Sequence, residues 1–238
     1  MTIPMMALQL AQGFTKTAGI FFLTLLGSLP LGFVIAFGRM SKWQPFRWLQ
    51  GIPSIPRWVQ RISGFRPIQF LTKIYISFMR GTPLILQIMV VYFGPYFLLH
   101  ISVTGAYRFW AAVIAFIINY AAYFAEIYRS GIGSVPVGQW EAAQVMGYTK
   151  GQTFFRIILP QVIRNVLPSV TNEVITLVKD TSLASVISVI EMFKTAQQLV
   201  TSQSTLMPFV IAAVFYYVFN SIVAWGMERA EKAFSYFR

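Results

Sequence analysis

Apolar stretches recur along the chain at lengths that suit a membrane-spanning helix. The first, Thr17–Phe37, has 21 residues and no charge, which at ~1.5 Å per residue matches a hydrocarbon layer of roughly 30 Å. Four more stretches follow, three of them free of Asp, Glu, Lys and Arg. The pattern predicts an all-α integral membrane protein in which residues 1–238 form one transmembrane domain. We expect five transmembrane helices, over about 17–37, 83–102, 109–125, 165–190 and 206–227.

The composition agrees with a membrane protein and narrows the chemistry. Apolar residues make up 56% of the chain and charged ones 11%, whereas soluble domains have about 25% charged residues. The net charge of +12 does not indicate nucleic-acid binding, because the basic residues lie in the connections between apolar stretches. The chain has no cysteine, which excludes disulfides, thiol catalysis and cysteine-based metal sites. We expect no cleavable signal peptide, since no basic segment leads and the first apolar stretch is long enough to span.

The distribution of Lys and Arg predicts how the spans are oriented. Basic residues are frequent in Arg39–Arg80, in Arg129–Arg164 and in the tail Glu228–Arg238, but they are almost missing from Leu99–Arg108 and Thr195–Thr205. Positively charged connections tend to stay in the cytoplasm. We therefore expect the N-terminus outside and the C-terminus in the cytoplasm, as an odd number of spans requires.

The segment Ser41–Arg66 differs from the rest of the chain because it mixes tryptophans, cations and prolines. Its prolines exclude one long helix. We expect a cytoplasmic loop or broken helix in the headgroup layer, where tryptophans and cations contact membrane lipids. A partner-protein or nucleic-acid site is the alternative. The residues concerned are Trp43, Trp48, Trp58, Lys42, Arg47, Arg57, Arg61, Arg66, Pro45, Pro53 and Pro56.

The fourth predicted span carries ionisable residues, which are costly inside a membrane and are usually functional. Glu173 and Asp180 are seven residues apart and therefore share one helix face. Pro168 and the sequence Lys179-Asp180-Thr181-Ser182 predict a discontinuous helix, which is a recurrent way to expose backbone groups to a substrate.

This set of polar residues suits the recognition of a zwitterion. Lys179 could meet a carboxylate, while Asp180 or Glu173 could meet an ammonium group or a cationic side chain. Asn119, Asn172, Thr181 and Ser182 could supply neutral hydrogen bonds. The alternative is that Lys179 and Asp180 neutralise each other and stabilise helix packing.

The stretch Gly138–Pro160 is polar and broken by glycines, although it lies between long apolar runs. Its helical part would show Glu141, Gln144 and Tyr148 on the polar face, whereas an interfacial helix would show Lys and Arg there. We therefore expect a docking surface for a separate protein. The chain has no phosphate-binding G-x-x-x-x-G-K-[ST] sequence, no H-E-x-x-H and no serine nucleophile elbow, so any ATP hydrolysis would occur in another subunit.

Several ordered motifs resemble those of one transporter family. Glu141-Ala142-Ala143, Gly147, Ile157, Leu159 and Pro160 match the EAA loop of ABC importer permeases in residue type and spacing. Three further stretches resemble the branch of that family that imports polar amino acids: Phe78–Leu84, Asn172-Glu173 followed by Lys179–Leu183, and Ala125–Arg129 leading to Gly138–Glu141. Ser41–Arg66 is longer and richer in tryptophan than the connection expected there.

The resemblance implies a fold, an activity and a set of partners. It implies a type I importer permease in a bacterial cytoplasmic membrane, paired with a second permease subunit, identical or homologous. Two cytoplasmic ATPases would hold ATP and Mg²⁺, an extracytoplasmic protein would deliver the amino acid, and this chain would hold no cofactor and catalyse no reaction. A short coupling helix would dock on the ATPases, through Glu141, Ala142, Ala143, Gly147, Leu159 and Pro160. An ion-coupled secondary transporter, a membrane enzyme and a channel or structural subunit are the alternatives.

Overall fold

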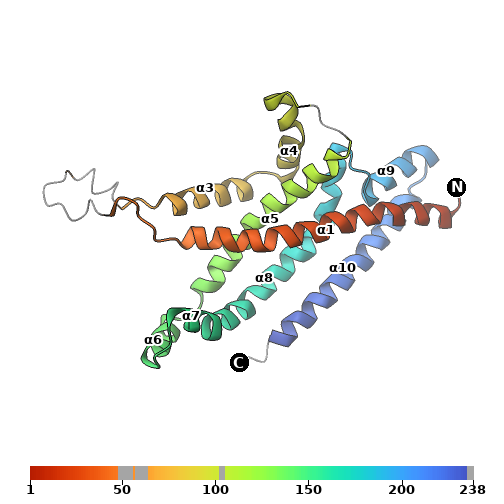
Figure 1. Cartoon of the computed structure of the whole chain (residues 1–238). Helices are drawn as coiled ribbons and strands as arrows, with labels where there is room; N and C mark the ends of the chain where they lie inside the picture. Colours follow the sequence, from red (N-terminus) through yellow and green to blue (C-terminus); the bar gives the residue numbers. More distant parts are fainter. Residues whose placement is uncertain (48–55, 57–63, 102–104, 235–238) are drawn as a thin grey trace.

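Helices form every regular element of the part of the chain described by this computed structural model, which is residues 1–47, 56, 64–101 and 105–234 (Figure 1). The predicted all-α membrane architecture is thereby confirmed. The elements are α1 (Ile3–Met40), α3 (Pro67–Gly81), α4 (Leu84–Leu99), α5 (Tyr107–Gly133), α6 (Val137–Val145), α7 (Lys150–Thr153), a π-helical turn (Phe154–Ile158), α8 (Leu159–Asp180), a 3₁₀ segment (Thr181–Ile187), α9 (Met192–Gln203) and α10 (Met207–Phe234).

The first helix, α1, runs unbroken for 38 residues, so residues 3–13 do not form a separate helix before the first predicted span. It packs most extensively against α5. A Cβ on Gly32 would lie 3.0 Å from the carbonyl oxygen of Ala121 on α5, and one on Gly27 would lie 2.5 Å from Ile117 Cδ1. Small residues therefore let the two helices approach closely, as is usual between membrane helices.

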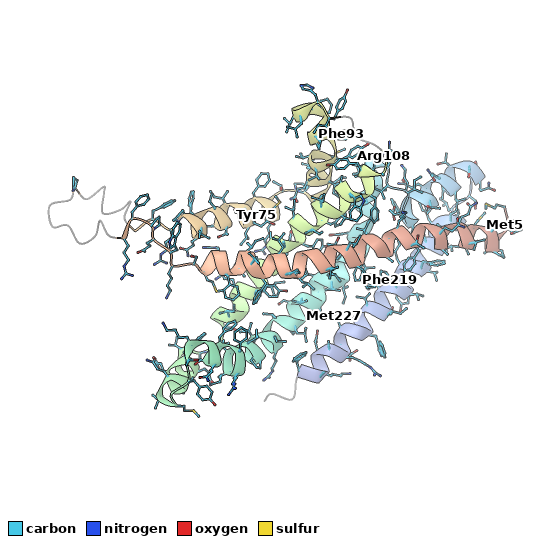
Figure 2. All side chains as sticks on the ribbon, in the orientation of Figure 1. Met5, Tyr75, Phe93, Arg108, Phe219 and Met227 are labelled. Carbon is cyan, nitrogen blue, oxygen red and sulfur yellow. The ribbon has the colours of Figure 1, made fainter. Side chains whose placement is uncertain are left out.

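Helices α3 and α4 meet at an elbow of 109°. The bend leaves carbonyl groups without helical partners, and two buried side-chain amides satisfy them. Gln87 Nε2 donates to the carbonyl oxygens of Met79 (3.0 Å) and Thr82 (3.2 Å), while Asn119 Nδ2 of α5 donates to the Met79 oxygen (3.1 Å) and to Gln87 Oε1 (2.9 Å). Tyr75 of α3 also points toward α5 (Figure 2), where its hydroxyl donates to the carbonyl of Ile118. These bonds fix both arms of the elbow on α5.

The predicted span 165–190 is not one continuous helix. The α-helix ends at Asp180, a 3₁₀ segment follows over Thr181–Ile187, and Ser188 adopts a left-handed conformation with φ of 59°. The change of helix type therefore lies at the predicted break, whereas Pro168 lies inside α8 without ending it. Among the described helices, α1, α5 and α10 are long and apolar enough to cross a membrane, and the bent pair α3–α4 makes up to four. The count of five spans stays a prediction.

The two ends of the molecule carry different elements. Figure 1 shows α6, α7 and the C-terminal end of α10 at one end, with the N-terminus and α9 at the opposite end. Between them, buried side chains of α1, α4, α5 and α8 form the main hydrophobic core. Phe219 of α10 packs edge-on against Phe21 of α1, with ring centroids 5.2 Å apart (Figure 2). Most of the predicted interfacial segment Ser41–Arg66 lies outside the described residues.

Candidate functional site

The acidic residues of α8 face α5. The hydroxyl of Tyr120, which is 3% exposed, donates a 2.7 Å hydrogen bond to Asp180 Oδ2. Glu173 lies two turns nearer to α6 along the same helix face and is half-buried. The acidic face of α8 therefore lies against the tyrosines of α5.

Glu173 opens into a polar cavity of about 400 Å³ between α3, α5 and α8. Arg80, the next-to-last residue of α3, reaches into the same cavity and places its guanidinium carbon 5.3 Å from the ring centroid of Tyr123. Oppositely charged side chains thus meet one cavity from different helices. The lining consists of Arg80, Tyr123, Glu126, Ile127, Ser130, Gly131, Ser134, Asn165, Val166, Ser169 and Glu173.

At the end of the cavity nearer to α6, the helices α5 and α8 contact each other directly. Asn165 Nδ2 donates a 3.0 Å hydrogen bond to Ser134 Oγ. A Cβ on Gly131 would lie 2.1 Å from Val166 Cγ1, so only glycine permits the helices to approach this closely. The residues of this close approach line the end of the cavity nearer to α6.

Lys179 lies on a different side of α8 from Asp180. It lines a second cavity of about 510 Å³ with Ser182 and with aromatic residues of α9 and α10, among them Phe193 and Tyr216. Lys179 and Asp180 form no salt bridge with each other. Neighbouring residues on a helix point about 100° apart, which explains the separation. The two residues are therefore not brought to one site.

The remaining predicted ligands are dispersed. Asn119 is 4% exposed and already bonded at the α3–α4 elbow. Thr181 is buried and donates to the Val178 carbonyl at 2.7 Å, while Asn172 is exposed. Arg80, Tyr120 and Tyr123, which the sequence reasoning did not assign to the site, contribute instead. The position of Arg80 at the start of the Gly81-Thr82-Pro83 helix break was a signal that could have found it.

A fully buried acid, Glu191, was also missed. It is 0% exposed and caps the start of α9, accepting hydrogen bonds from the backbone N–H groups of Phe193 and Lys194, both at 2.7 Å. It also accepts from the hydroxyls of Thr17 on α1 (3.3 Å) and Tyr216 on α10 (3.2 Å). These four bonds hold three helices together at the end of the molecule that carries the N-terminus. The sequence offered no clear cue, because N-cap positions favour Ser, Thr, Asp and Asn rather than Glu.

The polar stretch 138–160 forms two short helices at the other end. In α6, Ala143 is buried at 1% exposure, whereas Glu141 and Ala142 are exposed. Val145 and Met146 follow with 89% and 70% of their surface exposed, so an apolar tip projects from the described residues.

The chain then turns back toward α8. Gly147 takes a left-handed φ of 78°, and Thr149 and Gln152 form a reciprocal capping box at the start of α7. A π-helical turn leads into α8, whose first two residues are Leu159 and Pro160. The projecting helix α6 is thereby connected to Glu173 and Asp180 through nearly continuous helix.

Most of the chain is similar to known proteins. Residues 58–236 match the family described as "Binding-protein-dependent transport system inner membrane component". The arginine transport system permease protein ArtQ of Bacillus subtilis is 39% identical over 173 residues, which cover 72% of this chain and 78% of that protein. A probable amino-acid ABC transporter permease protein of the same organism, YckA, is 35% identical over 228 residues, covering 95% and 89%.

Solved structures share the fold. A chain from a crystal structure of an amino acid ABC transporter with histidines superposes with a TM-score of 0.77 at 29% identity, covering 94% of both chains. A chain of the MetNI methionine ABC transporter in an inward-facing conformation gives a TM-score of 0.68 at 16% identity, which indicates a common fold alone.

Proposed function

Because the chain belongs to the family of binding-protein-dependent transport system inner membrane components, we propose that it is the permease subunit of an ATP-driven importer of a polar amino acid. One observation carries the proposal. A short helix with an uncovered apolar tip, α6, leads through a turn and nearly continuous helix to two acidic residues of α8, Glu173, which lines a polar cavity, and Asp180, which is bonded to Tyr120. That connection is what a transport protein needs if its motor is a separate molecule.

The proposed complex contains several other subunits. Two cytoplasmic ATPases, which hold ATP and Mg²⁺, dock on α6, where Val145 and Met146 supply apolar contact area. A second permease, identical or homologous, faces this one across the pathway, and an extracytoplasmic protein delivers the amino acid. The orientation follows from charge, with the N-terminus outside and α6 and the C-terminus in the cytoplasm. Figure 1 supports this orientation, since the N-terminus lies opposite to α6.

The proposed cycle uses α6 as the coupling element. Closure of the ATPases on ATP draws the two α6 helices together and tilts α8, so that the interior opens outward. The delivered amino acid then passes the acidic face of α8, at Asp180 and Glu173. Hydrolysis separates the ATPases and returns the inward-open state. Such a cycle requires different contacts in its two states, which a docked helix can make.

Gly147 provides the test of coupling. Its φ of 78° lies in the left-handed region, and a Cβ there would meet nothing within 4 Å, so a substitution strains the backbone without steric overlap. Gly147→Val should lower ATP-driven uptake by about tenfold or more, because a left-handed conformation costs an ordinary residue roughly 1–2 kcal/mol. Gly147→Asn should keep most of the uptake, since asparagine tolerates this conformation.

The measurement is amino-acid uptake per ATP hydrolysed in proteoliposomes that contain the whole complex. Gly94→Ala is the matched control, because its site on α4 is equally open but has an ordinary φ. Gly147→Val should leave ATP hydrolysis intact while uptake falls. Uptake and hydrolysis that both survive Gly147→Val would contradict the coupling role. Uptake that persists without the ATPases and collapses with an ion gradient would instead identify an ion-coupled secondary transporter.

A further inference from the structure

A cavity of about 550 Å³ lies where the C-terminal end of α1 meets the N-terminal end of α3. Three cations line it, Arg39, Arg66 and Lys73, and no acidic side chain of the described residues does. The chain has no Asp or Glu before Glu126, so α1, α3 and the segment between them cannot neutralise these charges. Glu126 itself is bonded to Arg129. The cavity therefore concentrates positive charge.

Close packing of α1 against α3 holds two of the cations near each other. A Cβ on Gly38 would lie 2.9 Å from Thr72 Cγ2 and 3.4 Å from Ile68 Cγ2, so the two helices approach closely at this point. The residues that follow Gly38 and Thr72 are Arg39 and Lys73, and both line the cavity. Like charges held in one place repel each other, and a bound anion relieves that repulsion. The packing of the helices thus favours an anionic ligand.

An exposed apolar row on α3 begins at the rim of the cavity. Phe70 lines the cavity, and Ile74 and Phe78 follow it at intervals of four residues, so the three side chains share one face of the helix. All three are exposed. The bent pair α3–α4 is long and apolar enough to span a membrane, and exposed apolar surface of this kind marks contact with lipid. A ligand with a charged head and apolar chains therefore matches both parts of this surface.

We propose that the cavity binds the phosphate headgroup of an anionic phospholipid, whose acyl chains lie along the apolar row of α3. Arg39 and Arg66 present the paired N–H donors that suit a phosphate, and Lys73 adds a third positive charge. The volume of about 550 Å³ lies within the range usual for small-molecule sites. The apolar row at the rim favours a lipid over a free phosphate.

This lipid site goes beyond the proposed function and uses only the orientation from it. In that orientation the cavity lies at the cytoplasmic surface, because the N-terminal end of α1 is outside and Arg39 is at the other end of the same helix. Anionic lipids give the cytoplasmic leaflet a negative surface potential. The bound lipid would join the end of α1 to the start of α3 on the side where the motor subunits dock.

The test measures lipid binding by the purified permease–ATPase complex in detergent, where no charged bilayer surface attracts the protein. The probes are phosphatidylglycerol and phosphatidylcholine with the same fluorescent acyl chain, and fluorescence anisotropy gives each dissociation constant. The wild-type complex should bind phosphatidylglycerol about tenfold or more tightly than phosphatidylcholine, the size expected of a hydrogen bond between charged groups. The double variant Arg39→Gln/Lys73→Gln should bring that ratio close to one.

Controls separate the cavity from the general charge of this end of the chain. Lys42→Gln removes an exposed cation that follows α1 but does not line the cavity, and it should keep the wild-type ratio. Arg39→Lys keeps the charge and should keep most of the preference. If the double variant does not assemble, the single variants Arg39→Gln and Lys73→Gln decide the question, and each should lower the ratio about fivefold.

Three results would overturn the site. The first is a wild-type complex without a preference for phosphatidylglycerol, or a preference that the cavity variants leave unchanged. The second is an effect of Lys42→Gln as large as that of Lys73→Gln, which would indicate surface charge alone. The third is displacement of the lipid by inorganic phosphate or glycerophosphoglycerol as readily as by unlabelled phosphatidylglycerol, which would assign the cavity to a soluble anion.

The proposed function is tested separately by ATP-dependent amino-acid uptake of the wild-type complex with its solute-binding protein. Uptake by a complex that shows no lipid preference would refute the lipid site alone. A lack of uptake by a complex that prefers phosphatidylglycerol would refute the proposed function and leave the lipid site standing.

Discussion

The hydroxyl of Tyr120 donates a 2.7 Å hydrogen bond to Asp180 Oδ2, and this bond ties the middle of α5 to the last residue of α8. The α-helical part of α8 ends at this contact and the 3₁₀ segment begins. The bond therefore fixes the end of the element that leads from α6 into the interior.

Tyr120→Phe should destabilise the protein because it removes the bond and keeps the ring. A hydrogen bond to a charged group contributes about 1.5–3 kcal/mol, so the melting temperature of the detergent-solubilised complex should fall measurably. Tyr217→Phe is the control, since that side chain is 74% exposed and should leave the melting temperature unchanged. Equal melting temperatures for the two variants would show that the Tyr120–Asp180 bond contributes nothing.

Gly131→Ala should separate α5 from α8 because the added methyl would lie 2.1 Å from Val166 Cγ1. Overpacking of this kind costs about 1–3 kcal/mol. Val166→Ala removes the overlapping atom, so the double variant should be more stable than the sum of the single effects predicts. Thermal melting of the four proteins measures this coupling. Strict additivity would mean that the side chains at positions 131 and 166 do not interact.

Glu191→Ala should be the most destabilising of these substitutions. It leaves the N–H groups of Phe193 and Lys194 and the hydroxyls of Thr17 and Tyr216 without their acceptor. Each buried donor without a partner costs about 1–3 kcal/mol.

Glu191→Gln keeps one acceptor oxygen and should have an intermediate effect. Glu228→Gln, on an exposed pair with Lys232, should leave the melting temperature unchanged. Thermal melting of the three variants in detergent, alongside wild type, orders these effects. Wild-type stability in Glu191→Ala would show that the cap does not join α1, α9 and α10.

Much of the fold and the family could be predicted from the sequence because the signals are local. Hydropathy located α5 and α10, and the motif Glu141-Ala142-Ala143 with Gly147 located the segment that forms α6. The family resemblance read from these residues is confirmed by the match over residues 58–236. The change of helix type after Asp180 was also foreseen, since polar residues there interrupt an apolar run.

The arrangement of the site was harder to predict because it depends on contacts between distant residues. Arg80 lies on Tyr123 only because α3 and α4 meet at 109°, an angle that no local pattern specifies. Glu191 meets Thr17 across 174 residues. The separation of Lys179 from Asp180, however, follows from 3.6 residues per turn, so helical geometry alone could have kept them out of one site.

The continuity of α8 has a mechanical consequence. Its 22 residues span about 33 Å at 1.5 Å each, and the helix is joined at one end, through the π-helical turn, to the segment that carries α6. A tilt that begins at the α7 end therefore moves the far end of α8 the most. A tilt of about 10° at the α7 end would carry Asp180 through about 6 Å, roughly the size of an amino-acid backbone. A small rotation outside the membrane would thus be enough to move the acidic face past its ligand.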